Sequence, residues 1–234
     1  MLKKLMMTAG AALLALTFAG AANAASLSVN GGTTVGLSGF SLSGSTGLSD
    51  GDQVKLFDGT WWDLNGVPDT GGASDYGLQL DGAPAQLQFT YLGSEAGAEN
   101  RTIFSQGTDE VLFNNKTSSV GDSVTKTVTN DGLVPFYFEN ENGRACVIFL
   151  GCWDLADDQA PNTGGIDWDL SLAFFEDVDG SVIALFGDGS GDFDLDDMAI
   201  RISVVPLPPA LALFAGALAG LGWLSRRRKA VTTA

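Results

Sequence analysis

A short acidic segment late in the chain holds the side chains best suited to chemistry. Asp188, Asp192, Asp194, Asp196 and Asp197 lie within ten positions and are interspersed with glycine. Carboxylate oxygens on a flexible backbone are the ligands that Ca²⁺ prefers, because this ion takes about six to eight oxygens at roughly 2.4 Å. The segment is therefore a candidate Ca²⁺ site, and the other interpretation of it is a solvated acidic turn. We expect no other cofactor.

No linear calcium motif matches this segment. Counted from Asp188 as an EF-hand loop, the sixth position is Phe193 instead of glycine, and the twelfth is Ala199 instead of glutamate. The glycine-rich calcium-binding nonapeptide does not fit either. Two further acidic groups, at 154–158 and 176–179, could supply ligands to the same ion in the folded protein.

The residues around the segment have the pattern of a turn that opens a β-strand. Apolar residues alternate up to Leu195, and the alternation resumes at Met198 in the opposite phase. Such a slip turns the buried face of a strand over unless a bulge absorbs it. We therefore expect Asp196 and Asp197 to lie at a β-bulge.

The region from 25 to 205 has the pattern of an all-β protein. Leu87–Tyr91, Val124–Val128 and Ile166–Leu172 alternate apolar and polar residues, and no stretch keeps an apolar period of 3.6. Short strands at fairly regular intervals predict a single antiparallel β-sandwich or jelly-roll-like domain. Ser26–Ser49, rich in Ser, Gly and Thr, is expected to form edge strands, with a flexible linker as the alternative.

The N-terminus has the form of an export leader. Two lysines precede an apolar run from Leu5 to Ala22, and Ala22 and Ala24 form a small-x-small cleavage site. The mature protein is then expected to begin at Ala25. An uncleaved membrane anchor is the alternative.

The C-terminus combines a proline motif, an apolar span and a basic end. The motif consists of Val205, Pro206, Leu207 and Pro208. The span from Leu207 to Leu224 is close to the roughly 20 residues that a transmembrane helix needs. The basic end consists of Arg226, Arg227, Arg228 and Lys229. Basic residues stay on the cytoplasmic side, so this order places residues 25–205 outside the cytoplasm.

This three-part tail resembles the PEP-CTERM group of bacterial sorting signals, and specifically its VPLPA-CTERM variant. Val205 to Pro208 match the motif residue for residue, and Pro209 stands where the variant has alanine. The resemblance implies recognition and trimming by a membrane enzyme called exosortase. It also implies a place at exopolysaccharide, biofilm or outer-envelope surfaces of Gram-negative bacteria. The glycosylation sequons at Asn100 and Asn115 are interpreted as chance matches in that setting.

Export also decides how the two cysteines are interpreted. Cys146 and Cys152 are separated by five residues. Outside the cytoplasm two cysteines favour one disulfide, which would stabilise so small a loop by roughly 2 kcal/mol. Free buried thiols are the alternative. A zinc site is not expected, because the chain has no histidine and only two thiols.

The charge of the exported region excludes one class of partner. All 28 acidic residues lie between Asp50 and Asp197, where only six basic residues accompany them, so residues 25–205 carry a net charge of −22. Such a field repels nucleic acid and anionic lipid surfaces, and it favours solubility and multivalent cations. We expect no nucleic-acid partner.

Catalysis is not indicated by the residue types. The absence of histidine excludes Ser-His-Asp, Cys-His and His-metal centres. A pair of carboxylates at the spacing used by glycoside hydrolases arises readily by chance among so many acids. We therefore expect a non-enzymatic protein, with a carboxylate-based glycoside hydrolase as one alternative. A Ca²⁺-dependent carbohydrate-binding module is another, because tryptophans could stack on sugar rings; the candidates are Trp61, Trp62, Trp153 and Trp168.

Together these features predict four regions. They are a leader at 1–24, an acidic β-sandwich ectodomain at 25–204, a sorting signal at 205–229 and a tail at 230–234. The protein is expected to be tethered to the inner membrane by its C-terminal helix, and then to reach the cell surface or extracellular matrix. Its expected partners are the sorting enzyme, the membrane before processing, and an extracellular polysaccharide.

Overall fold

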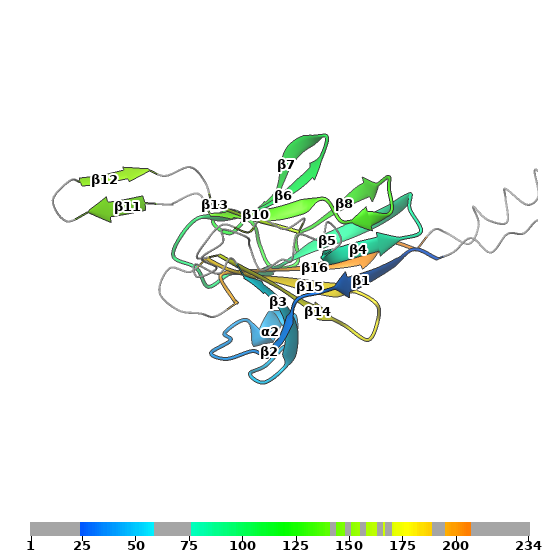
Figure 1. The fold of residues 1–234 in the computed structure, drawn as a ribbon, viewed down its shortest axis with the longest axis horizontal. Coiled ribbons are helices and arrows are strands. Elements are labelled where there is room, and N and C mark those ends of the chain that lie inside the picture. Colours follow the sequence, from blue (N-terminus) through cyan, green and yellow to red (C-terminus); the bar gives the residue numbers. More distant parts are fainter. Residues whose placement is uncertain are drawn as a thin grey trace, which may run out of the picture. The chain divides into compact units, whose positions relative to one another are not determined.

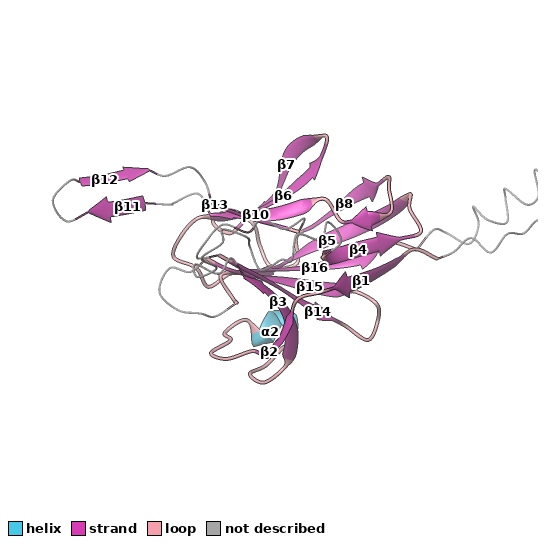
Figure 2. Cartoon of the chain, viewed as in Figure 1, coloured by secondary structure: helices cyan, strands magenta, loops and turns pink. Residues whose placement is uncertain are grey.

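The computed structural model describes residues 24–58, 76–140, 144–147, 151–154, 158–162, 166, 170–188 and 195–206; side chains are left out at 58, 144–147, 151–154 and 158. The regular secondary structure of these parts is β-strand, apart from a single turn of helix, α2 (Ser43–Thr46) (Figure 2). Residues Ala25–Val205 form one compact unit, separate from the two ends of the chain. No helix in the described ranges is long and apolar enough to cross a membrane. The predicted leader and the span from Leu207 to Leu224 lie outside these ranges.

The largest sheet runs through the middle of the domain and is antiparallel throughout (Figure 1). Its seven strands lie in the order β2 (Thr33–Gly36), β3 (Gln53–Asp58), β14 (Ser171–Glu176), β15 (Val182–Gly187), β16 (Met198–Val204), β5 (Ala85–Gly93) and β8 (Ser123–Val128). The last strand of the domain, β16, thus lies between an early strand and a late one.

Smaller antiparallel sheets complete the domain. One has four strands, in the order β13 (Asp158–Pro161), β10 (Phe136–Asn140), β6 (Asn100–Gln106) and β7 (Thr108–Asn114). Another has three, in the order β1 (Ser26–Asn30), β4 (Gly77–Asp81) and β9 (Gly132–Leu133). The hairpin of β11 (Arg144–Val147) and β12 (Gly151–Asp154) forms a sheet of its own.

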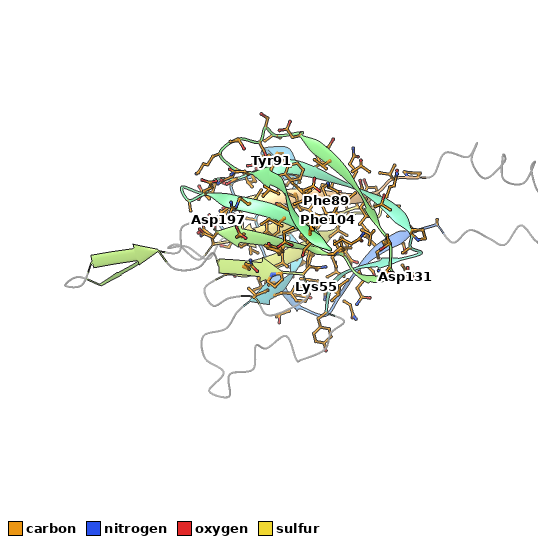
Figure 3. The ribbon with its side chains drawn as sticks, turned by 90° about the horizontal axis from the view of Figure 1, so that it is seen from above. Lys55, Phe89, Tyr91, Phe104, Asp131 and Asp197 are labelled. Carbon is orange, nitrogen blue, oxygen red and sulfur yellow. The ribbon has the colours of Figure 1, made fainter. Side chains whose placement is uncertain are left out.

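Aromatic rings fill the space between the largest sheet and the four-stranded sheet. Phe89 of β5 and Phe104 of β6 lie near the middle of the domain (Figure 3). Ring pairs that join the two sheets include Phe89 and Phe104 at 5.9 Å between centroids, Phe136 and Phe174 at 6.3 Å, and Phe138 and Phe186 at 5.1 Å. These residues belong to one buried cluster, which also takes in Leu78 and Leu80 of β4; we call it the main core. The predicted all-β antiparallel fold is confirmed, and the packing of sheet on sheet is consistent with a β-sandwich.

A second core lies on the opposite face of the largest sheet. Along β15, Val182, Ala184 and Phe186 belong to the main core, whereas Ile183 and Leu185 belong to the second. Alternate strand residues point to opposite faces, so β15 is buried on both sides. The segment between β2 and β3, which contains α2, covers this face of the sheet, and its Leu37, Phe40 and Leu48 belong to the second core. A continuous apolar strand is the expected sequence for such a position.

The predicted strands fall mostly where the pattern placed them. Leu87–Tyr91 lies within β5 and Val124–Val128 within β8. The third predicted strand was placed too early, because β14 begins only at Ser171 and both Ile166 and Leu170 precede it. Ser26–Ser49 contributes β1 and β2, each at an edge of its sheet, before it turns into the cover over the second core.

The prediction of a bulge at Asp196 and Asp197 is wrong in its position. Both residues precede β16, and the register of β16 against β5 shifts between Ala199 and Ile200, which pair with Gly93 and Tyr91. The extra residue is Leu92 of β5, which packs in the second core while Tyr91 packs in the main core. The bulge therefore redirects a leucine of β5, not the aspartates.

Asn162 connects two sheets by imitating a strand. Its carboxamide accepts a hydrogen bond from the Leu78 amide at 2.7 Å and donates to the carbonyls of Leu78 and Val134, each at 2.8 Å. Its own amide donates to the Phe136 carbonyl at 3.1 Å. With Asn162 only 1% exposed, no water is available to replace these bonds. Asn162 thus joins β4 and the residue after β9 through its side chain, and β10 through its backbone amide.

Asn162→Ala is expected to lower the free energy of unfolding by roughly 3 kcal/mol or more, because each buried polar group left without a partner costs about 1–3 kcal/mol. Urea unfolding of the full-length chain in non-ionic detergent, followed by circular dichroism, measures the loss. Asn114→Ala is the control, since Asn114 is only half-buried and water can reach its partners. Equal losses in the two variants would contradict the role given to Asn162.

Gly77→Ala is expected to destabilise the fold through the same junction. Gly77 has φ +131°, and a Cβ there would lie 2.4 Å from the Asn162 carbonyl oxygen. Gly132, with φ +111° and no atom within 4 Å of a Cβ, isolates the cost of the backbone conformation alone. The alanine at 77 should cost about 1–3 kcal/mol more than the alanine at 132. Matched urea midpoints for the two variants would refute the clash.

Candidate functional site

The largest sheet brings the two ends of the acidic segment together. Asp188 follows directly after β15, and Asp196 and Asp197 directly precede β16. Because β15 and β16 are antiparallel neighbours, with Phe186 opposite Met198, all three aspartates lie at the same end of the sheet. Figure 3 places Asp197 at this end of the domain and Asp131 at the other. Asp192 and Asp194 lie outside the described residues.

These three aspartates are not on the surface, as an acidic turn would be. Asp188 is 5% exposed, Asp196 is fully buried and Asp197 is 3% exposed. Burying a carboxylate is costly unless hydrogen bonds or a counter-charge compensate for the lost water. The alternative of a solvated turn therefore does not describe these residues.

Hydrogen bonds tie Asp188 and Asp197 into one network. The Asp188 amide donates to the Asp197 carboxylate at 2.6 Å, and Asn100 Nδ2 donates to the Asp188 carboxylate at 3.2 Å. The Asp197 carbonyl accepts from Ser94 Oγ at 2.5 Å and from Asn100 Nδ2 at 3.4 Å. We call Ser94, Asn100, Asp188 and Asp197 the acidic end. These four residues lie at or next to the ends of β5, β6, β15 and β16, so the network joins four strands.

Asp196 has a different task from its neighbour. Its carboxylate Oδ2 accepts a hydrogen bond from the Ser41 amide, and its carbonyl accepts one from the Glu95 amide at 3.0 Å. Ser41 belongs to the segment that covers the second core. Asp196 therefore fastens that cover to the sheet. Its other carboxylate oxygen, Oδ1, is buried and has no hydrogen-bond partner among the described residues.

Asn100 is the residue of this site that sequence reasoning missed. It opens β6 and is fully buried, and its Oδ1 has no hydrogen-bond partner within the described part of the chain. The backbone amide of Asn100 donates to Asn115 Oδ1 at 3.0 Å, and Asn115 Nδ2 donates to Ser94 Oγ at 3.1 Å. The two sequon asparagines therefore hold this end of the domain together. A fully buried Asn100 cannot carry a glycan in the folded protein.

The described carboxylates are not grouped as a set of three metal ligands. No cluster of at least three Asp, Glu, Cys or His side chains that could hold a metal is found within the described ranges. The predicted ligands Asp192 and Asp194 are not part of that search. Any cation at this end must draw on other oxygens beside the carboxylates of Asp188 and Asp197.

The acidic group at 176–179 does not join the acidic end. Asp177 and Asp179 lie in the turn between β14 and β15, at the opposite end of β15 from Asp188. Arg201 pairs with Asp177 at 2.9 Å and with Asp179 at 3.7 Å. Hydrogen bonds from the side chain and backbone of Ser181 lower the pKa of Asp179. The expectation that this group could share an ion with Asp188 is therefore wrong. The side chains at 154–158 are outside the description.

A second polar group lies on the four-stranded sheet. Arg101 forms an ion pair with Glu139, and the Tyr137 hydroxyl donates to Asp109 at 3.2 Å. Burial raises the pKa of Tyr137 to about 12, with the negative charges of Asp109 and Glu139 adding to the effect. These contacts satisfy structural needs.

The cysteines face each other across the β11–β12 hairpin. The backbone register pairs Cys146 directly with Cys152. Residues opposed in an antiparallel pair have Cα atoms about 4.5–5.5 Å apart, which is within the range that a disulfide spans. Their side chains lie outside the description, so the disulfide stays a prediction. The side chains of all four candidate sugar-stacking tryptophans also lie outside the description, so their stacking on sugar rings stays a prediction too.

A small apolar pocket offers no catalytic chemistry. It measures about 10 Å³, room for roughly one water molecule, and its walls include Phe57, Phe174 and Asn162. No carboxylate lines it.

Comparison of the chain with models of known protein families, with curated proteins and with solved structures found no match. The site is therefore interpreted from its own contacts alone.

The raised pKa of Tyr137 predicts a loss of stability in alkali. Its folded value of about 12 lies above the ordinary value of 10.0, so the unfolded chain ionises first. The stability that comes from the neutral phenol is complete below pH 10 and is lost as the pH rises from about 10 to about 12. Urea midpoints measured across this window should fall more steeply for the natural protein than for Tyr137→Phe. Equal declines of the urea midpoint with pH in the two proteins would contradict the raised pKa of Tyr137.

Proposed function

We propose that this chain is an exported, non-catalytic protein of the bacterial cell surface or extracellular matrix, delivered by its C-terminal sorting signal. In this proposal residues 1–24 are a cleaved leader, the region from Ala25 to Val204 is a single β-sandwich ectodomain, and residues 207–224 are a membrane helix. An exosortase-type enzyme trims the chain near Val205 to Pro209. The ectodomain then remains with extracellular polysaccharide.

The observation that carries the proposal is where the compact domain begins and ends. Ala24 is exposed, whereas Ala25 packs against the main core and β1 starts at Ser26. At the other end β16 stops at Val204, the Val205 amide still donates to the Gln86 carbonyl at 2.8 Å, and Pro206 is exposed. Cleavage at the two predicted positions would thus leave every described strand and every described core residue in the domain.

The first and last residues of the domain lie at the same end of it. Ser26 pairs with Asp81 at the end of β4, and the Val205 amide donates to the Gln86 carbonyl near the start of β5. Only a short turn separates β4 from β5. From there β5 runs nine residues, roughly 25–30 Å, to the acidic end. The acidic end and the two ends of the domain are therefore at opposite ends of β5.

A non-catalytic role agrees with the contacts of the described acids. Their carboxylates accept hydrogen bonds from backbone amides, basic side chains and neutral polar side chains, as Asp196 does from Ser41, Glu139 from Arg101 and Asp109 from Tyr137. No observation on the described residues favours a sugar-binding face or a hydrolase cleft. The surface or matrix role is therefore preferred over these alternatives.

Processing in a bacterium that carries an exosortase-type enzyme tests the proposal. The natural chain should lose its C-terminal end near 205–209 and leave the membrane fraction, as seen by intact mass and fractionation. Pro206→Ala with Pro208→Ala should block trimming and keep the protein in the membrane, because the motif is what the enzyme recognises. Thr232→Ala with Thr233→Ala, beyond the basic end, is the control and should be trimmed normally. Equal trimming in all variants, or trimming in a strain without the enzyme, would refute the proposal.

A further inference from the structure

We propose that the acidic end binds one hard divalent cation of the Ca²⁺ type through the carboxylates of Asp188 and Asp197 and the carboxamide oxygen of Asn100. This inference concerns the folded domain alone and does not depend on the proposed sorting or location of the protein. It also changes the ligand set expected from the sequence, because Asn100 comes from a distant strand and Asp196 is assigned to the cover of the second core.

The first argument is the buried oxygen of Asn100. The residue is fully buried, and its Oδ1 lacks a hydrogen-bond partner in the described part of the chain. An acceptor that is removed from water without a donor costs about 1–3 kcal/mol, so native proteins rarely leave one in that state. Nδ2 of the same carboxamide contacts the Asp188 carboxylate, which places Oδ1 next to the acids. A cation there would complete the oxygen's coordination.

The second argument is the charge at this end. Asp188 and Asp197 are held together by the 2.6 Å bond between the Asp188 amide and the Asp197 carboxylate. The two buried aspartates thus place two carboxylates at one end of the sheet, and their negative charge attracts a cation.

The third argument is the chemical class of the ligands. The acidic end offers carboxylate and amide oxygens, with no nitrogen or sulfur ligand among the described side chains that form it. Oxygen-only sites of irregular geometry suit Ca²⁺, whereas Mg²⁺ demands near-octahedral coordination and zinc prefers nitrogen and sulfur. With few protein ligands the site should be weak, in the range of about 10⁻⁴–10⁻³ M that extracellular calcium modules show.

Calcium titration of the full-length chain in non-ionic detergent tests the site. The protein is first stripped with a chelator, and CaCl₂ is then titrated from about 10 µM to about 10 mM, the range that brackets such sites. Equilibrium dialysis counts bound ions, and the thermal midpoint reports coupled stabilisation. We expect one saturable site per chain and a higher midpoint with CaCl₂ than with MgCl₂.

Variants separate this site from the general attraction of an acidic surface. Asp188→Asn and Asn100→Leu should each weaken binding at least tenfold. Asn100→Asp, which keeps an oxygen and adds a charge, should bind at least as tightly as the natural chain. Asp81→Asn removes one exposed charge elsewhere and should bind as the natural chain does.

Each contrary result overturns the proposal. These results are no saturable binding by the natural chain, unchanged binding by Asp188→Asn, and equal weakening by Asp188→Asn and Asp81→Asn. Circular dichroism checks that each variant is folded. If Asn100→Leu fails to fold, Asp188→Asn and Asn100→Asp decide the question, because both replace a side chain with one of nearly equal size.

Discussion

The rest of the structure depends on the burial of β15 on both faces. Alternate residues of this strand pack into two separate cores, so neither face of the sheet's centre can accept a polar side chain. Along β15 polar side chains are therefore confined to the points where the strand ends. Asp188 follows β15, Asp196 and Asp197 precede β16, and antiparallel pairing brings these points together. The position of the acidic end thus follows from the core, because β15 accepts no charge along its length and the aspartates lie where the two strands end or begin.

Polar side chains with buried bonds hold the layers together where strand pairing stops. The Asn162 side chain supplies the acceptor and the two donated hydrogen bonds that a strand would otherwise provide to Leu78 and Val134. The Asn115 side chain, which follows β7, does the same for the start of β6 at Asn100 and for the loop before it at Ala98. Asparagine suits these places because its carboxamide carries the same donor and acceptor groups as a peptide bond. Hydrophobic packing sets the stability of the two cores, and these amides fix how the layers join.

Sequence patterns were informative where one face of a strand is buried. The alternation in Leu87–Tyr91 and Val124–Val128 identified β5 and β8, because period two is the direct result of one wet and one dry face. The same reasoning did not predict the second core, because residues 37–48 form a loop and a single helical turn whose apolar residues follow no regular period. It also misplaced the bulge. The change of phase between Leu195 and Met198 is real, yet it reflects a chain entering the sheet from the second core, and the bulge belongs to Leu92 of the neighbouring strand. Long-range pairing of this kind leaves no local pattern, which is also why Asn100 was not recognised beside Asp188.

The acidic end and the two ends of the domain lie at opposite ends of β5. Ser26 and Val205 both lie beside the turn that joins β4 to β5, and β5 carries the chain from there to Ser94 at the acidic end. Nine residues of strand, roughly 25–30 Å, separate the two places. Salt screens exposed charges over about 8–10 Å at physiological ionic strength. A cation at the acidic end would therefore respond mainly to the carboxylates beside it, and less to the rest of the net charge of −22 on residues 25–205.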